Sequence, residues 1–523
     1  MEINTIRKNP MRVDLRIAYI YPSLYQVMIS SLATDTIYFL VNSREEVYLE
    51  RFHSTSLTDS ERESRSLETN SPLRDFQLYL TTIHYEPDIV NLISILDAAR
   101  VPVLSRDREI PIIAGGPAAM SNPTPYEEII DAFIVGEAEV TLDKIIDLRL
   151  EYIDNKKKFL ESIASLRYVY VPGYSDERVF REYVRNLDET FYPVRQIENT
   201  EIEPVFGRGF KLELSRGCRF WCSFCMESRL SQPYRERSYE NLKKILERGS
   251  KYTISGRRVI LYSLLTPASL NQLRFLEYLA EEGYVASIPS LRLNDLFILS
   301  SDLLDIIKRL RQRMITIAPE TFSMRIQKSF FKYIEPTEAL LKRILEIIDR
   351  RFDLKIYMIY GLKWEREEDI KLNIEILKKI ARHARERGSR VSISLNPLIP
   401  KPHTVFQWIG MREIDSLHKI LALYLRELRG LIEARTLDLD WGVAQAIISM
   451  SPKPLTKILI EWSRSGRRIS SFKRLIRELD IRYVFEGYKF EQQLPWSKIN
   501  LGEEIERVNS KLYEVIRDYL KYI

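Results

Sequence analysis

All cysteines of the chain lie in one short stretch. Cys218, Cys222 and Cys225 are the 3 cysteines of a 523-residue sequence, and the hydrophobic stretch Phe210-Lys-Leu-Glu-Leu before them predicts a strand. Three thiolates on one loop can bind three irons of a [4Fe–4S] cube and leave the fourth iron open to another ligand. This cysteine loop (residues 218–225) is therefore the feature from which the rest of the chain is interpreted.

The cysteine loop has two other interpretations. A structural zinc site usually has four protein ligands, and the sequence has no fourth cysteine and no histidine within the loop. The histidines are His53, His84, His383, His403 and His418. Unconnected buried thiols would not be expected to gather in one loop while the rest of the chain lacks cysteine. The spacing therefore favours an iron–sulfur cluster.

The spacing C-x-x-x-C-x-φ-C, in which φ is Phe224, resembles the radical S-adenosylmethionine (SAM) superfamily. The resemblance implies that Cys218, Cys222 and Cys225 hold one [4Fe–4S] cluster and that SAM chelates the open iron. One electron from the cluster would then cleave SAM and give a 5′-deoxyadenosyl radical, which takes a hydrogen atom from an unactivated carbon. A one-electron reductant, ferredoxin-like or flavodoxin-like, is the partner this implies.

Residues 206–410 alternate strand-like and helix-like segments and predict a partial (β/α)6 barrel. The predicted strands are residues 210–214, 259–263, 285–289, 314–318, 355–360 and 391–395. Polar side chains follow several of them, where the active face of such a barrel lies. Ser263, Arg292, Glu320 and Arg325 are the candidates for SAM contacts, because SAM offers ribose hydroxyls and a carboxylate. An ordinary loop or ion-pair role is the alternative for each.

Residues 1–150 also alternate strand and helix, which predicts a doubly wound, Rossmann-like parallel sheet. Ligands of such sheets bind beyond the carboxyl ends of the strands. The loops Gly115-Gly116 and Gly136-Glu137 follow two predicted strands. Their glycines allow the backbone to approach a large cofactor closely.

The segment from Gly115 to Glu139 resembles the cobalamin-binding domain fused to one branch of radical SAM enzymes. The resemblance implies that Gly115, Gly116, Gly136 and Glu137 hold cobalamin. Many cobalamin domains carry D-x-H-x-x-G, whose histidine ligates cobalt, and residues 21–28 at the corresponding loop contain no histidine. Radical SAM relatives commonly lack it too, and the resemblance therefore implies a lower face that is unligated or covered by other side chains. The alternative is a domain that keeps the fold without the cofactor.

The remaining segments are a connector (151–205) and a mostly helical C-terminal region (411–523), with helices expected near 411–435, 442–450 and 455–465. Residues 53–66 are polar and predict a surface loop, and residues 169–174 and 191–194 predict small strands. Basic residues at 464–468, 473 and 474 fit either a hydrated surface or contact with phosphate or anionic lipid.

The first ten residues lack the apolar core of a secretory signal, and no apolar run is long enough to span a bilayer. We expect a cytoplasmic protein, with peripheral contact to a membrane as the alternative. The net charge of +6 neither requires nor excludes a nucleic-acid partner.

The sequence thus predicts a cobalamin-dependent radical SAM enzyme that methylates an unactivated carbon or forms a carbon–carbon bond. Ring formation on archaeal tetraether membrane lipids is one alternative, because the lipid ring synthases are broadly similar in architecture. Modification of RNA or protein is another. A non-catalytic cobalamin or iron–sulfur sensor is the alternative from a different class. No cysteine is left for an auxiliary cluster.

Overall fold

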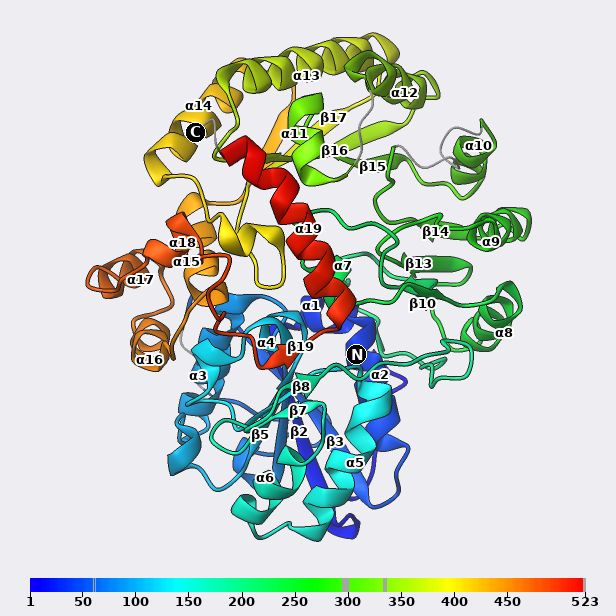
Figure 1. The fold of residues 1–523 in the computed structure, drawn as a ribbon. Helices are drawn as coiled ribbons and strands as arrows, with labels where there is room; N and C mark the ends of the chain where they lie inside the picture. Colours follow the sequence, from blue (N-terminus) through cyan, green and yellow to red (C-terminus); the bar gives the residue numbers. More distant parts are fainter. Residues whose placement is uncertain (60, 62, 294–300, 333–335, 521–523) are drawn as a thin grey trace.

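The computed structural model describes residues 1–59, 61, 63–293, 301–332 and 336–520. It has two α/β units, one below the other in Figure 1, with the C-terminal helices packed along both. Among the described residues, no helix combines the length and the apolar character needed to cross a membrane.

The N-terminal unit is the doubly wound sheet that the sequence predicts. Its six strands run in the order β3-β2-β4-β5-β6-β7, and all neighbours pair in parallel except β6 and β7. The strands are β2 (Leu15–Leu24), β3 (Val47–Ser54), β4 (Leu78–Thr82), β5 (Ile112–Gly115), β6 (Ala132–Ile134) and β7 (Val169–Tyr170). The helices are α1 (Tyr25–Ser30), α2 (Leu32–Asn42), α3 (Ile89–Ala98), α4 (Pro117–Ser121), α5 (Ala138–Glu151) and α6 (Lys156–Ala164).

Both faces of this sheet are buried. Along β2, Ala18 and Ile20 belong to one apolar core, and Ile17 and Tyr19 belong to the core on the opposite face. Helices cover each face, so the central strands are apolar on both sides. The carboxyl ends of the strands point toward the second unit (Figure 1).

Strand β3 corrects the prediction of a surface loop that begins at residue 53, because residues 53 and 54 are its last two residues. Its centre holds Glu50 and Arg51, both fully buried. Arg16 neutralises Glu50 at 2.7 Å, and Glu68 neutralises Arg51 at 2.6 Å. The charged residues Glu50 and Arg51 made this segment difficult to predict as a buried strand, because their ion-pair partners lie far away in the sequence.

The second unit is a partial barrel with all six strands that the sequence predicts. They are β10 (Phe210–Glu213), β13 (Arg258–Tyr262), β14 (Val285–Ser287), β15 (Met314–Glu320), β16 (Asp353–Tyr360) and β17 (Val391–Pro397). Parallel pairing gives the orders β10-β13-β14 and β15-β16-β17-β18, and a bridge between Leu291 and Ile317 joins the two groups. The helices on its outside are α8 (Tyr239–Gly249), α9 (Leu270–Glu281), α10 (Ser301–Arg309), α12 (Thr337–Asp349) and α13 (Glu367–Arg387), whereas α11 (Met324–Phe330) packs against the cysteine loop.

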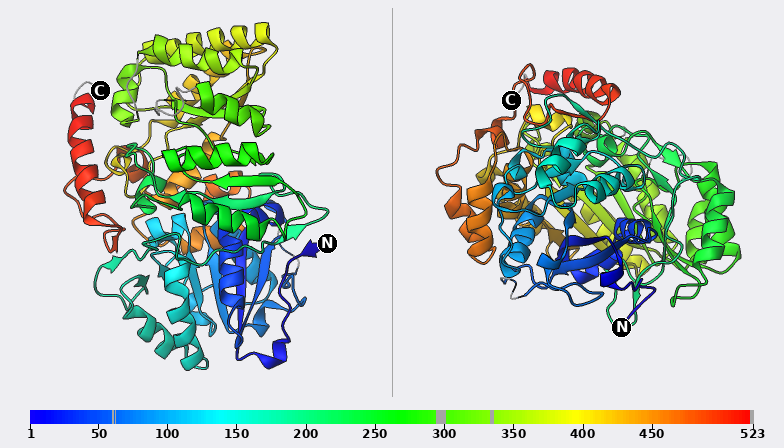
Figure 2. Two further views of the ribbon diagram at one scale, coloured as in Figure 1. Left: turned by 90° about the vertical axis from the view of Figure 1, so that its right-hand side faces the viewer. Right: turned by 90° about the horizontal axis from the view of Figure 1, so that it is seen from below.

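The C-terminal region is mostly helical, as expected, but it adds strand β18 (Glu433–Thr436) to the barrel sheet. The helix expected over 411–435 ends earlier, at Leu428, and Gly430 follows with φ +74°. The helices are α14 (Ile414–Leu428), α15 (Leu439–Ser449), α16 (Thr456–Arg464), α17 (Ile469–Leu475), α18 (Arg482–Glu486) and α19 (Glu503–Leu520). Helix α19 runs along the side of the barrel (Figure 2, left).

Short elements join the units. They are β1 (Glu2–Ile3) with β9 (Glu198–Asn199), β8 (Val179–Phe180) with β19 (Ile499–Asn500), β11 (Ser215–Arg216) with β12 (Arg235–Glu236), and α7 (Glu227–Leu230). The small strand expected at 191–194 does not form. Pro193 has no N–H to donate, and the Tyr192 hydroxyl instead donates to the Lys211 carbonyl at 2.8 Å.

Candidate active site

The three cysteines line one cavity of about 390 Å³ at the carboxyl ends of the barrel strands. Gly217, with φ +80°, turns the chain from the strand pair β11–β12 into the cysteine loop. Among the described residues, no three His, Cys, Asp or Glu side chains converge on a position for a single metal ion. The three thiols on the wall of one cavity fit the cysteine ligands of an iron–sulfur cube whose fourth iron is open to another ligand.

Arg229 of α7 fixes the backbone of the cysteine loop. Its buried guanidinium donates to the carbonyls of Cys222 and of Cys225, the latter at 3.2 Å. Its Nε and Nη2 also donate to Oδ1 of Asn509 on α19, at 3.2 and 3.1 Å. Burial raises the pKa of the Cys225 thiol to about 11, so this thiol keeps its proton at neutral pH until a metal displaces it.

Two of the four residues predicted to contact SAM line the cysteine cavity. The Arg292 guanidinium lies 3.6 Å from the centroid of the Phe220 ring, and its Nη1 donates to the Cys222 sulfur at 3.4 Å. Glu320 ends β15 with φ +63° and pairs with Lys332 at 2.6 Å. Both are placed to meet a polar ligand bound beside the cysteines, and their contact with SAM stays a prediction.

The other two predicted residues lie elsewhere. The Ser263 hydroxyl is 2.7 Å from that of Ser215 and lines a neighbouring, larger cavity. Arg325 forms an ion pair with Asp369 and donates to the Trp364 carbonyl at 2.8 Å, and it lines neither cavity. The structure therefore brings Arg292 and Glu320, but not Arg325, to the cysteines.

Lys332, Tyr357 and Asn396 line the cysteine cavity and were missed in the sequence. Tyr357 and Asn396 come from the barrel strands β16 and β17, which were predicted. The side chain at each strand position that faces inward could have been read from the alternation along these strands. Lys332 follows α11 and carried no such signal.

The larger cavity, about 690 Å³, lies between the carboxyl edge of the N-terminal sheet and the start of the barrel. Its lining includes the predicted cobalamin residues Gly115, Gly116, Gly136 and Glu137. A Cβ atom on Gly115 would meet no atom within 4 Å, so this position opens onto free space. A Cβ on Gly116 would lie 2.8 Å from the Ile83 carbonyl oxygen, and one on Gly136 would lie 2.5 Å from that of Glu182. In this glycine cradle (Gly115, Gly116 and Gly136), close packing against the protein's own backbone thus requires Gly116 and Gly136, and Gly115 leaves open space.

Leu264, 44% exposed, is shared by the two cavities and forms part of the wall between them. Gly217 lines the larger cavity and the next residue, Cys218, lines the smaller. A ligand in one cavity would therefore lie next to a ligand in the other.

Family comparisons agree with this geometry. Residues 212–377, which include the cysteine loop and most barrel strands, match the model of the radical SAM superfamily, and residues 33–172 match that of the N-terminal region of radical SAM proteins. The chain is a radical SAM protein. One [4Fe–4S] cluster and SAM are the cofactors that this family implies, and Cys218, Cys222 and Cys225 are the residues that would hold the cluster.

Other proteins resemble this radical SAM protein over most of its length. An uncharacterized protein of Methanocaldococcus jannaschii is 29% identical over 497 residues, covering 93% of this chain and 98% of its own. The radical SAM methyltransferase TsrM of Kitasatospora setae, solved with cobalamin and a [4Fe–4S] cluster, superimposes with a TM-score of 0.54 and 11% identity, over 88% of this chain and 99% of that one. The cobalamin-dependent enzyme OxsB, solved with aqua-cobalamin and SAM, gives a TM-score of 0.50 and 13% identity, over 97% and 80%. At these identities the likeness is one of fold.

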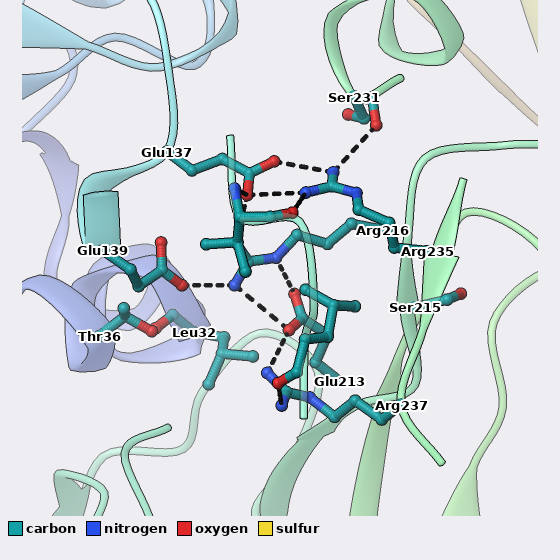
Figure 3. Close-up of polar contacts among 12 residues, drawn as sticks. Leu32, Thr36, Glu137, Glu139, Glu213, Ser215, Arg216, Ser231, Arg235 and Arg237 are labelled. Carbon is teal, nitrogen blue, oxygen red and sulfur yellow. Dashed lines mark hydrogen bonds and ion pairs between the residues drawn. The ribbon is translucent and has the colours of Figure 1, made fainter. Parts of the chain in front are cut away.

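A buried ion-pair network in this radical SAM protein joins its two α/β units beside the larger cavity (Figure 3). Glu137, just before α5, pairs with Arg181 at 2.7 Å, with Arg216 at 2.9 Å and with Arg235 at 2.8 Å. Arg216 continues to Glu213 at 2.8 Å on the barrel strand β10. Burial acts to raise the pKa of Glu137, but the three arginines outweigh it and lower that pKa to about 2.

Glu137 is thus a link between the units, although it was predicted for its position in a cofactor loop. It lines the cavity, but arginines engage both of its carboxylate oxygens. The partners Arg216 and Arg235 lie on β11 and β12, and sequence reasoning missed them because nothing local marks a pairing across such a distance.

Proposed function

We propose that this radical SAM protein is a cobalamin-dependent enzyme that methylates an unactivated carbon or forms a carbon–carbon bond. The observation that carries the proposal is the pair of adjoining cavities that share Leu264. One has three thiols on its wall, and the other has a glycine cradle at the carboxyl edge of a doubly wound sheet. The likeness in fold to TsrM and OxsB, both solved with cobalamin, supports the same assignment.

The chain's own residues would divide the work between the cavities. When bound, the cluster with SAM supplies one-electron chemistry, and cobalamin supplies methyl-transfer or radical chemistry. The cysteines hold the cluster, and Arg292 and Glu320 orient polar groups of SAM. Gly115 leaves room for the corrin, and Gly116 fixes the turn of the loop that borders it. The apolar side chains of Leu264 and Leu265 lie at the cysteine cavity and keep water from the reacting carbon.

Anaerobic reconstitution tests this proposal. The protein is loaded with iron, sulfide and hydroxocobalamin and passed through gel filtration, and then SAM and dithionite are added. We expect bound iron, visible absorbance of retained cobalamin, and 5′-deoxyadenosine release even without substrate. Cys222→Ser should lose the iron and the 5′-deoxyadenosine while it keeps cobalamin. Retention of both cofactors with no SAM cleavage would favour a sensor, and release of all cobalamin would overturn the cobalamin assignment.

Ring formation on tetraether membrane lipids is a narrower form of this proposal. Leu264 in the wall between the cavities and Leu265 in the lining of the cysteine cavity are apolar, which suits a hydrocarbon substrate. Such a reaction would need access to lipid from the membrane surface. Deleting the gene and measuring core membrane lipids by mass spectrometry tests it. Loss of ring-containing lipids is expected, whereas an unchanged lipid profile would reject this substrate.

A further inference from the structure

The five histidines have different surroundings. The Nδ1 of His53 contacts its neighbouring carbonyl, on Ser54, at 2.8 Å. His383 contacts Asp349 at 2.8 Å, and His403 contacts the Ser121 carbonyl at 2.9 Å. His418 lies on the exposed side of α14. Within the described residues, His84 alone lines the larger cavity, and neither of its ring nitrogens makes a hydrogen bond to the protein.

The backbone places His84 beside the glycine cradle. The preceding residue, Ile83, donates its N–H to the Gly115 carbonyl at 3.0 Å and accepts at its own carbonyl from the Ala118 N–H at 3.1 Å. These two bonds tie the loop after β4 to the loop after β5. The imidazole then packs against the Tyr21 ring, with the ring centroids 5.8 Å apart.

The environment of His84 keeps its imidazole neutral. Burial among protein atoms lowers its pKa to about 4, and no charged group contributes to that shift. The side chain nevertheless keeps accessible surface. His84 is an exposed residue of the free chain, and it lines the larger cavity. A neutral imidazole without a hydrogen-bond partner has a nitrogen lone pair available to a metal.

The sheet order explains how this residue can reach a ligand above the strands. Strands β2 and β4 are parallel neighbours, with Ile20 opposite Thr81, so their carboxyl ends lie side by side. The loop after β2, residues 21–28, has no histidine. The loop after the neighbouring strand β4 contains His84.

We propose that His84 binds the cobalt of cobalamin in the larger cavity, on the face of the corrin turned toward the N-terminal sheet. This inference rests on the proposed function. It assigns the cobalt ligand to the loop after β4, and it gives Tyr21 the task of holding the imidazole ring in place. A nitrogen ligand on this face would stabilise the oxidised cobalt and disfavour its most reduced form.

Electron paramagnetic resonance of the Co(II) form tests the assignment. The full chain is produced with natural or ¹⁵N-labelled histidine, loaded with hydroxocobalamin, passed through gel filtration and reduced by one electron. We expect each cobalt line to be a triplet in the unlabelled protein and a doublet in the labelled protein. Because the dimethylbenzimidazole of cobalamin carries no label, the change to a doublet identifies a protein histidine.

Variants locate the nitrogen in the sequence. His84→Ala should retain cobalamin but lose the histidine splitting, whereas His53→Ala, which alters a histidine outside this cavity, should keep it. Retained cobalamin with identical labelled and unlabelled spectra would overturn the role of His84 and leave the proposed function standing. If the unaltered protein retains no cobalamin, both proposals fail. Labelling the unaltered chain shows whether a histidine binds the cobalt even if His84→Ala does not fold.

Discussion

Gly115 and Gly116 are neighbours in the chain with opposite surroundings. Gly116 has φ +93° and ψ 166°, a conformation that is almost restricted to glycine, and a Cβ there would lie 2.8 Å from a backbone oxygen. Gly115 has free space where its Cβ would stand. The fold therefore requires glycine at position 116, whereas at position 115 a side chain would take up space that a ligand in the cavity needs.

Alanine substitution should separate these two roles. Gly116→Ala is expected to lower the free energy of unfolding by about 1–3 kcal/mol, because the new side chain strains the backbone. Gly115→Ala should leave that free energy within about 0.5 kcal/mol of the original and weaken cobalamin retention, because its methyl group enters the cavity. Urea unfolding and gel filtration with hydroxocobalamin measure the two quantities. Equal stability losses in both variants would contradict this division.

Arg292 has a second task besides any contact with SAM. Its Nη1 donates to the sulfur of Cys222 at 3.4 Å, and a donor of this kind stabilises the reduced, more negative cluster. Arg292→Met should therefore lower the reduction potential of the reconstituted cluster by roughly 60 mV, the one-electron equivalent of about 1.4 kcal/mol. Redox titration followed by electron paramagnetic resonance measures it. Arg292→Lys keeps the charge and should show a smaller shift; equal potentials in all three proteins would refute the hydrogen bond's influence.

The amide of Asn509 on helix α19 is hydrogen-bonded to Arg229, which holds the backbone of the cysteine loop. Asn509 accepts from Arg229 and donates to the His403 carbonyl at 2.6 Å, so it ties α7, α19 and the segment after β17 together. The apolar side of α19 adds Ile516 to the core around Phe330 and Phe406. The position of the cysteine loop thus depends on a helix far from it in the sequence.

Removing that amide should loosen the loop. Asn509→Ala leaves the buried Nε of Arg229 without its acceptor, which should cost about 1–3 kcal/mol of unfolding free energy and hasten iron loss from the reconstituted protein to a chelator. Ser510→Ala is the comparison, because that hydroxyl bonds only to the Glu506 carbonyl of its own helix. Similar iron-loss rates for both variants would show that α19 does not hold the loop.

Helices and strands could be predicted from the sequence wherever a local pattern of residues determines them. The apolar runs of β10 and β16 and the loop cysteines are local signals, and the structure confirms the barrel strands in order. Strand β3 was missed because Glu50 and Arg51 read as surface residues until their distant partners are known. Strand β18 was missed because three of its four residues, Glu433, Arg435 and Thr436, are polar, and the local sequence does not indicate that it pairs with β17.

The site was predictable to the same extent. Residues that end neighbouring strands were expected near one another, and Arg292 and Glu320 do share the cysteine cavity. A residue at a strand end can face either of the two adjoining cavities, and the direction of its side chain decides which. Ser263 therefore lines the larger cavity, beyond Leu264, and not the cysteine cavity. Arg325 follows the same strand as Glu320 and was expected to pair with the carboxylate of SAM, and in the structure its guanidinium pairs with Asp369.

The ion-pair network around Glu137 gives the joint between the two α/β units a dependence on pH. The pKa of Glu137 is lowered from 4.5 to about 2 in the folded protein. A carboxyl group with a lowered pKa stabilises the fold fully above its unfolded value and loses that contribution as pH falls toward its folded value. The contribution of Glu137, up to about 3 kcal/mol, should therefore be present above about pH 5 and disappear between about pH 5 and pH 2.

Comparison with Glu137→Gln isolates this effect from the other acidic groups. The variant should be less stable at pH 7 by about 3 kcal/mol or more, since it leaves three arginines short of their shared charge. The difference in unfolding free energy between the two proteins should shrink as the pH is lowered from 5 to 2. Urea unfolding at stepped pH measures it, and a difference that stays constant with pH would contradict the assignment.

The contact between Arg229 and Asn509 also has a consequence for how each molecule is made. Asn509 follows Arg229 by 280 positions, so the ribosome releases the cysteine loop well before α19 is synthesised. Until α19 has been made, Arg229 lacks its Asn509 acceptor, so the contacts that hold the cysteine loop are completed only late in synthesis.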